Sequence, residues 1–184
     1  MISILMDTRM PIKTIFLDRD GVINKEVTYL HKIEDFIFLE GVFEACLHFQ
    51  KAGYEIILVT NQSGIGRRLY SKADYERITD WMLKQFNKNG INILDIFYCP
   101  HAPNANCNCR KPKPGMFLAA RNKYNIDLEH SWMIGDKEDD IIAANDAGIN
   151  KTILVRSGHE INECISNASY IVNSIHDSKA IIKN

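Results

Sequence analysis

The sequence lacks any long hydrophobic run. Every apolar stretch falls well short of the roughly 20 residues that a helix needs to span a bilayer. The opening segment from Met1 to Met6 is apolar, but no basic residues precede it and it runs directly into Asp7, unlike a secretory signal. We therefore expect no export signal and no membrane-spanning helix, and we predict a cytoplasmic protein.

An excess of charge of either sign is also missing. The 184 residues include 22 lysines and arginines and 23 aspartates and glutamates, which leaves a formal net charge of −1. The basic residues are scattered, so no positive field is available to attract nucleic acid or an acidic membrane. The composition, 46% hydrophobic and 24% charged, is typical of an ordered globular protein. These values leave room for a small anionic substrate held by a few local cations.

Short apolar runs alternate with amphipathic patterns along the chain, without repeats or a linker between domains. The predicted strands cover residues 13–18, 55–60, 96–98, 132–134, 151–156 and, at an edge, 170–172. The predicted helices cover residues 41–52, 71–88, 114–124, 140–147 and, closing the chain, 174–182. We predict a single domain over residues 1–184 with a three-layer α/β fold, a mostly parallel sheet with helices on both faces. The functional site of such a sheet lies at the carboxyl ends of its strands.

Two carboxylates follow the first predicted strand, in the segment Asp18-Arg19-Asp20-Gly21. Acidic side chains two residues apart can share a magnesium ion, and one can attack phosphorus while the other passes a proton to the leaving oxygen. An isolated Asp-x-Asp is more often a solvated turn. Whether this pair is catalytic can therefore be judged only together with the polar residues at the ends of the other strands.

Three further polar segments lie at strand ends or helix starts. Thr60 and Asn61 offer a hydroxyl and backbone amides to a phosphoryl oxygen, although such a pair alone is usually a turn or a cap. Arg110 and Lys111 precede a helix N-terminus, where cations and backbone donors converge on an anion, although a solvated basic turn is as common. Asp136 opens an acidic cluster that the helix dipole alone would favour.

In their order along the chain, these four segments resemble the motif set of the haloacid dehalogenase superfamily: Asp-x-Asp, then Thr or Ser, then Lys, then Gly-Asp with a following Asp. The resemblance covers residues 13–158 and implies the fold of that family with a minimal cap. It implies that Asp18 is the nucleophile that becomes an aspartyl phosphate and that Asp20 is the general acid and base. It also implies that Thr60 and Lys111 hold the transferring phosphoryl group.

The same resemblance implies a magnesium site. The implied ligands are the carboxylates of Asp18 and Asp136 and the backbone carbonyl of Asp20. Asp139 or Asp140 would orient them, and the sequence leaves both open. The chemistry agrees with this assignment, because a phosphate dianion repels an attacking carboxylate and a divalent cation with a nearby lysine offsets that charge.

Three of the five cysteines cluster with a histidine in one loop, at about residues 99–110. Cys99, His101, Cys107 and Cys109 could close a tetrahedral zinc site with no position open for a substrate, which is the form of a structural site. Free thiols or a disulfide are the alternative, but a bridge between Cys107 and Cys109 would be strained. We predict one structural Zn²⁺ that braces the loop leading into the basic segment.

A zinc loop that runs directly into Cys-Arg-Lys-Pro narrows the resemblance to two related groups, the heptose bisphosphate phosphatases and the histidinol phosphate phosphatases. Ile23-Asn24 and Gln62-Ser63 are similar to the first group, which implies release of the C7 phosphate from D-glycero-D-manno-heptose 1,7-bisphosphate, in the biosynthesis of nucleotide-activated heptose. Val22 and Glu26 depart from the threonine and aspartate common there. The implied substrate contacts are Glu26, Val27, Thr28, Tyr29, Asn61, Gln62, Ser63, Arg110 and Lys137.

Three alternatives stay open at this point. Hydrolysis of histidinol phosphate is the nearest. A 3′-phosphatase acting on nucleic acid ends would share the Asp-x-Asp chemistry, but the net charge of −1 gives no sign of the basic strip it needs. A zinc-binding recognition module without catalysis would have no use for Asp18. The C1 anomer of the sugar is not readable from these residues, and we predict a monomer because no long coiled or exposed apolar helix is evident.

Overall fold

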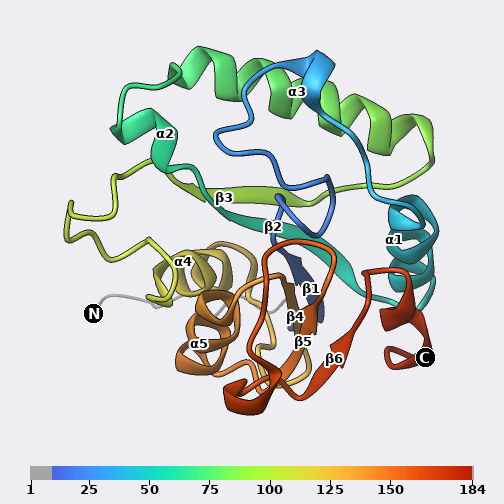
Figure 1. Cartoon of the computed structure of the whole chain (residues 1–184). Helices are drawn as coiled ribbons and strands as arrows, with labels where there is room; N and C mark the ends of the chain where they lie inside the picture. Colours follow the sequence, from blue (N-terminus) through green and yellow to red (C-terminus); the bar gives the residue numbers. More distant parts are fainter. Residues whose placement is uncertain (1–9, 184) are drawn as a thin grey trace, which may run out of the picture.

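Six parallel strands form one sheet in the computed structural model, which describes residues 10–183. The segment Met1–Met6, for which we expect no export signal, lies outside the described residues. The strand order is β3-β2-β1-β4-β5-β6 (Figure 1). The strands are β1 (Thr14–Leu17), β2 (Glu55–Asn61), β3 (Asp95–Cys99), β4 (Trp132–Gly135), β5 (Lys151–Val155) and β6 (Tyr170–Val172). The predicted parallel sheet is confirmed, including its edge strand β6.

The helices cover both faces of the sheet, which gives the predicted three layers. Helices α1 (Val42–Lys51) and α3 (Lys72–Lys88) lie on one side, and α4 (Gly115–Tyr124) and α5 (Glu138–Ala147) on the other (Figure 1). Successive residues of β1 alternate between the two cores: Ile15 and Leu17 belong to the first, and Phe16 to the second. Strands buried on both faces carry continuous apolar runs, which explains the uninterrupted runs in the sequence.

The predicted closing helix over residues 174–182 is wrong. The segment contains only a short 3₁₀ helix, η3 (Asp177–Ala180). Asp177 accepts the backbone N–H of Ser174 at 3.0 Å, and the hydroxyl of Ser178 donates to the carbonyl of Ile175. These side-chain bonds compete with the helical backbone pattern, which is why the apolar periodicity here does not produce an α-helix. Two other 3₁₀ helices and a short helix were also not predicted: η1 (Ile33–Asp35), η2 (Glu163–Ile165) and α2 (Ser63–Gly66).

The segment between β1 and α1 stands in the place of a cap. Within the described residues it contains no helix longer than η1, in agreement with the minimal cap that the resemblance implies. Its aromatic residues anchor it on α3, because the Phe36 ring lies 5.4 Å from Trp81 and the Phe38 ring 5.7 Å from Phe86, centroid to centroid. The preceding residues, 26–30, are thereby held over the carboxyl edge of the sheet and line a cavity there.

The helices of residues 10–183 are all too short or too polar to cross a membrane.

Candidate active site

Asp18, Thr60 and Asp136 meet at one edge of the sheet because their strands are neighbours. Strand β1 pairs with β2 on one side and with β4 on the other, and all three are parallel. The chain moves outward from β1 to β2 and β3, and then crosses back to β4 on the opposite side of β1. Crevices that bind ligands form where the strand order reverses in this way.

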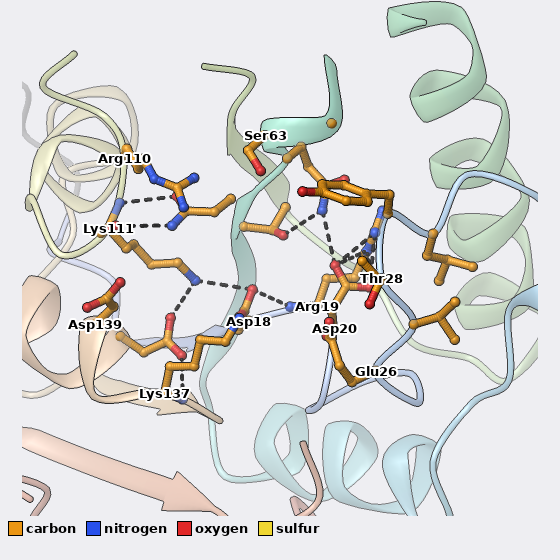
Figure 2. Close-up of a pocket in the computed structure, with 18 of the residues that line it drawn as sticks. Asp18, Arg19, Asp20, Glu26, Thr28, Ser63, Arg110, Lys111, Lys137 and Asp139 are labelled. Atoms are coloured by element: carbon orange, nitrogen blue, oxygen red, sulfur yellow. Dashed lines mark hydrogen bonds and ion pairs between the residues drawn. The ribbon is translucent and has the colours of Figure 1, made fainter. Parts of the chain in front are cut away.

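A cavity of about 180 Å³ opens at this edge. In Figure 2 the Lys111 side chain reaches Asp18 from one side, and Asp20 lies on the other side of Asp18. Asp136, the predicted metal ligand that follows β4, does not line the cavity and is fully buried. All the predicted catalytic and substrate-binding residues line the cavity: Asp18, Asp20, Glu26, Val27, Thr28, Tyr29, Thr60, Asn61, Gln62, Ser63, Arg110, Lys111 and Lys137.

Lys111 is the buried cation of the site. Its ammonium nitrogen lies 3.1 Å from Oδ1 of Asp18 and 2.5 Å from Oδ1 of Asp140, and it donates to the carbonyl of Val59 at 2.7 Å. Burial by itself lowers the pKa of Lys111, but Asp140 and Asp18 more than offset this effect, and the net shift is upward. The ammonium group therefore stays charged opposite the predicted nucleophile.

The carboxylates around Lys111 outnumber it. Burial raises the pKa of Asp18 to about 6, although Lys111 acts to lower it, and Oδ1 of Asp18 also accepts the backbone N–H of Arg19 at 2.7 Å. Burial also raises the pKa of Asp136 and of Asp140 above the ordinary range. When these carboxylates are all ionised, their negative charge exceeds the single positive charge of Lys111. A divalent cation among them would offset this excess and so favour the ionised forms.

The arrangement of these oxygens fits Mg²⁺. Oxygens of Asp18, Asp136 and Asp140 lie within 4.8 Å of one another. Oδ1 of Asp136 is buried and has no hydrogen-bond partner among the described residues, which is costly unless a cation binds it. Hard cations such as Mg²⁺ take oxygen ligands of this kind. The structure brings Asp140 rather than Asp139 to this cluster, and Oδ2 of Asp140 accepts the N–H groups of Asp136 and Lys137, each at 3.1 Å.

Donors surround the carboxylate of Asp20. Both of its oxygens accept from Nε and Nη2 of Arg19, at distances between 2.8 and 3.2 Å. Oδ1 also accepts the side-chain N–H of Asn24 at 2.9 Å, and Oδ2 that of Gln62 at 3.1 Å. Because each partner is a donor and Arg19 is itself buried, Asp20 is held in one orientation at the cavity wall.

The amide side chains of Asn61 and Gln62 are engaged with their neighbours. Asn61 donates to the carbonyl of Lys111 and accepts its N–H, both at 3.1 Å. The amide of Gln62 donates to Thr60 at 2.9 Å as well as to Asp20. Both residues line the cavity, and their side chains also fix the positions of Lys111 and Asp20.

Sequence reasoning missed three residues that hold the site together: Arg19, Tyr70 and His159. Tyr70 donates its hydroxyl to Gln62 at 2.7 Å, and Nδ1 of His159 lies 2.6 Å from Oδ2 of Asp136. Arg19 stands between the two predicted aspartates, where a basic residue is usually solvated, but it is only 2% exposed. The aspartate next to it was a usable signal, since a buried arginine needs such a partner. Tyr70 and His159 lie in segments without periodicity and offered none.

The cysteine loop brings the four predicted zinc ligands together. The sulfur of Cys99 lies 3.6 Å from that of Cys107 and 3.2 Å from that of Cys109, and Nδ1 of His101 lies 3.5 Å from Cys99 and 3.2 Å from Cys109. A tetrahedral site with Zn–S of about 2.3 Å and Zn–N of about 2.0 Å has ligand-to-ligand edges of roughly 3.5–3.8 Å. Two of the four distances lie in this range, and the two that involve Cys109 are slightly shorter, at 3.2 Å. The four ligand atoms are thus close enough to surround one Zn²⁺, and none of the cysteines is in a disulfide.

Comparison with known proteins agrees with this geometry. A family model described as HAD-hydrolase-like matches residues 108–178. The chain is 48% identical over 177 residues to a D-glycero-alpha-D-manno-heptose-1,7-bisphosphate 7-phosphatase of Photorhabdus laumondii, covering 92% of this chain and 97% of the relative. It is 47% identical over 171 residues to a D-glycero-beta-D-manno-heptose-1,7-bisphosphate 7-phosphatase of Vibrio cholerae, covering 89% of this chain and 92% of the relative.

A solved structure shows the same fold. The D,D-heptose 1,7-bisphosphate phosphatase of B. bronchiseptica, crystallised with magnesium and phosphate, matches with a TM-score of 0.83 and 30% identity, over 93% of this chain and 98% of that one. The fold and the site at its strand-order reversal define the chain as a HAD-like phosphatase. Within that class, the chain belongs to the family of D-glycero-D-manno-heptose-1,7-bisphosphate 7-phosphatases.

Proposed function

We propose that this chain removes the C7 phosphate from D-glycero-D-manno-heptose 1,7-bisphosphate, in the biosynthesis of nucleotide-activated heptose. The observation that carries the proposal is the buried cluster of Asp18, Asp140 and Lys111 at the strand-order reversal. The cluster lies at the wall of a polar cavity, in a chain whose relatives are named for this sugar bisphosphate. Arg110, Lys111 and Lys137 all line the cavity, and three cations suit a substrate with two phosphates.

The residues of the cavity divide the reaction into two steps. A carboxylate oxygen of Asp18 attacks phosphorus, the bond from phosphorus to the C7 oxygen breaks, and Asp20 gives its proton to that oxygen. Asp20 then takes a proton from water as the water attacks the aspartyl phosphate, which releases inorganic phosphate and restores the carboxylate of Asp18. Thr60 and Lys111 hold the phosphoryl oxygens in both steps, where negative charge spreads over them.

We infer that the carboxylates of Asp18 and Asp136 and the backbone carbonyl of Asp20 would hold Mg²⁺. The unpartnered buried oxygen of Asp136 supports this assignment. When bound there, Mg²⁺ offsets the negative charge of the phosphoryl group. Asp140 positions the site by accepting the backbone N–H of Asp136 and by pairing with Lys111.

Arg110 supports a bisphosphate as the substrate. Its Nη1 is buried and has no hydrogen-bond partner in the described part of the chain, and the residue lines the cavity. A guanidinium group with a free donor is suited to a phosphate oxygen, so we infer that Arg110 contacts the phosphate that is kept. Arg110→Ala should lose activity on the bisphosphate more than on a simple phosphomonoester, whereas Arg121→Ala, on the exposed face of α4, should change neither. Equal loss on both substrates in Arg110→Ala would exclude this role.

We further infer that the cysteine loop holds a structural Zn²⁺. Its ligands Cys107 and Cys109 precede Arg110 and Lys111 directly, and the Lys113 ammonium donates to the carbonyl of Cys107 at 2.8 Å. A fixed loop therefore fixes the two cations that enter the cavity. Thiols kept for a metal agree with a reducing compartment, and we propose that the enzyme acts in the cytoplasm.

The test of the proposed function compares substrates. Phosphate release should be measured with Mg²⁺ for the alpha and beta anomers of the heptose bisphosphate and for histidinol phosphate. We expect one heptose anomer to have the highest kcat/KM and activity to disappear without Mg²⁺. The chain is 48% identical to a relative named for the alpha anomer and 47% identical to one named for the beta anomer. The ratio of the two kcat/KM values therefore assigns the preferred anomer. A higher kcat/KM for histidinol phosphate would overturn the proposal.

A further inference from the structure

The loop after β5 closes over Asp136. The hydroxyl of Ser157 donates to the carbonyl of Gly21 at 2.7 Å, which ties this loop to the turn after β1. Gly21 and Gly158 both approach the Asp136 carboxylate so closely that a Cβ atom on either would collide with its Oδ2. The two glycines therefore enclose one oxygen of Asp136 between two backbone segments.

His159 supplies the hydrogen bonds to that enclosed oxygen. Oδ2 of Asp136 accepts the backbone N–H of His159 at 3.0 Å and lies 2.6 Å from the ring nitrogen Nδ1. An ionised carboxylate only accepts hydrogen bonds, so Nδ1 carries the hydrogen in this contact. The other oxygen of Asp136, Oδ1, is buried and has no hydrogen-bond partner within residues 10–183. The two oxygens thus have different surroundings, one held by the protein and one left for a cation.

The second nitrogen of the ring faces the substrate side. Nε2 of His159 lies 3.7 Å from Oε1 of Glu26, longer than a direct hydrogen bond but within reach of an ion pair or a bridging water. Glu26 lines the cavity at the start of the segment that replaces a cap. His159 therefore stands between the buried carboxylate of the predicted metal site and the wall of the substrate cavity.

We propose that His159 is a positioning residue that holds one oxygen of Asp136 so that the other binds Mg²⁺. The proposal rests on the proposed Mg²⁺ site. Without the imidazole, Oδ2 would keep only one donor, and the Asp136 carboxylate could turn away from its like-charged neighbours Asp18 and Asp140. Partners that orient metal ligands in this way typically contribute 10–100-fold to metal affinity.

Two substitutions separate the hydrogen bond from the bulk of the ring. The side-chain nitrogen of an asparagine can occupy nearly the position of Nδ1, whereas alanine offers no donor. We expect His159→Ala to weaken Mg²⁺ binding by about 10-fold or more and His159→Asn to restore most of it. At saturating Mg²⁺, kcat of His159→Ala should recover toward that of the parent, because the catalytic groups are untouched.

His130 offers a matched control. It contacts Asp127 through the same two groups, its backbone N–H at 3.1 Å and Nδ1 at 2.8 Å, but it lies before β4, at the other end of the sheet from the cavity. His130→Ala removes an equivalent histidine–aspartate pair and should leave Mg²⁺ affinity unchanged.

The experiment is a calorimetric titration of each full-length variant with Mg²⁺, together with kcat measured across Mg²⁺ concentrations. The proposal is supported if His159→Ala alone binds Mg²⁺ weakly and His159→Asn binds it nearly as well as the parent. Parent-like affinity in a folded His159→Ala, or a loss that His159→Asn does not repair, overturns the role of His159 and leaves the proposed function intact. A parent that neither binds Mg²⁺ nor releases phosphate with it would overturn both.

Discussion

The carboxylate cluster and the zinc loop are built in opposite ways. Asp18, Lys111, Asp136 and Asp140 come from segments spread over much of the chain, and each is at most 8% exposed. The predicted zinc ligands lie within residues 99–109, and His101 among them is exposed. The first cluster forms only when the whole sheet folds, whereas the second needs one loop and a metal ion.

This difference determines what each cluster contributes. Buried carboxylates that repel one another oppose folding until a cation joins them, so we expect the carboxylate cluster to serve chemistry at a cost in stability. A closed zinc site contributes directly to folding and performs no chemistry. Changes in the first cluster should therefore affect activity before stability, and changes in the second should affect stability first.

The largest expected effect is on activity, from Asp18→Asn. An amide in place of the carboxylate cannot form an aspartyl phosphate, and we expect kcat to fall by at least about 10³-fold. Thermal unfolding should show that the variant remains folded. Asp80→Asn, an exposed position on α3, is the isosteric control and should keep parental kcat. Residual turnover close to the parental rate in Asp18→Asn would rule out Asp18 as the nucleophile.

The next effect belongs to the zinc loop. Cys107→Ser should lose the bound zinc and lower the Tm, and it should reduce activity through the displaced Arg110 and Lys111. Cys164→Ser, which changes an exposed cysteine outside the cluster, should alter none of these properties. Metal analysis after purification without chelator, together with Tm, makes the comparison. If the parent contains no zinc, the zinc site must be abandoned.

A smaller effect should appear in the pH dependence of stability. Burial raises the pKa of Asp18 from its ordinary 3.8 to about 6, so folding favours its protonated form. In Mg²⁺-free protein this contribution to stability is complete below about 3.8 and is lost as the pH rises through about 6. The free energy of unfolding, measured from pH 5 to 8 in Mg²⁺-free buffer, should therefore show that Asp18→Asn becomes more stable relative to the parent as the pH rises. A difference that does not change with pH would contradict the raised pKa of Asp18.

The smallest effect should come from a region that belongs to neither cluster. Ser71 caps α3 by accepting the backbone N–H of Asp74 at 3.1 Å, while the Asp74 carboxylate accepts the N–H of Ser71 at 3.0 Å. Ser71→Ala should cost about 1 kcal/mol of unfolding free energy in chemical denaturation. The kcat should stay at the parental value. A loss of activity without loss of stability would mean that α3 takes part in the site in a way that this account omits.

The sequence predicted the sheet well because its strands are apolar runs that end in polar turns. Parallel strands bring their carboxyl ends together whatever the details of packing, so the sequence also placed Asp18, Thr60 and Asp136 at one edge. The other predicted residues of the cavity were implied by the resemblance to the haloacid dehalogenase superfamily. The closing helix failed because Ser174, Asp177 and Ser178 bond the backbone locally, and a hydrophobic pattern does not report such bonds. Contacts such as His159 with Asp136 join residues far apart in the chain, and they follow from loop positions that only the folded structure supplies.

The most direct test of the central claim is to trap the intermediate. The enzyme should be mixed with the heptose bisphosphate and Mg²⁺, quenched with acid during turnover, reduced with borohydride and digested for mass spectrometry. The account predicts homoserine in place of aspartate at position 18, because borohydride reduces an aspartyl phosphate. Active enzyme with unmodified Asp18, or with the modification at Asp20 or Asp140 instead, would contradict it.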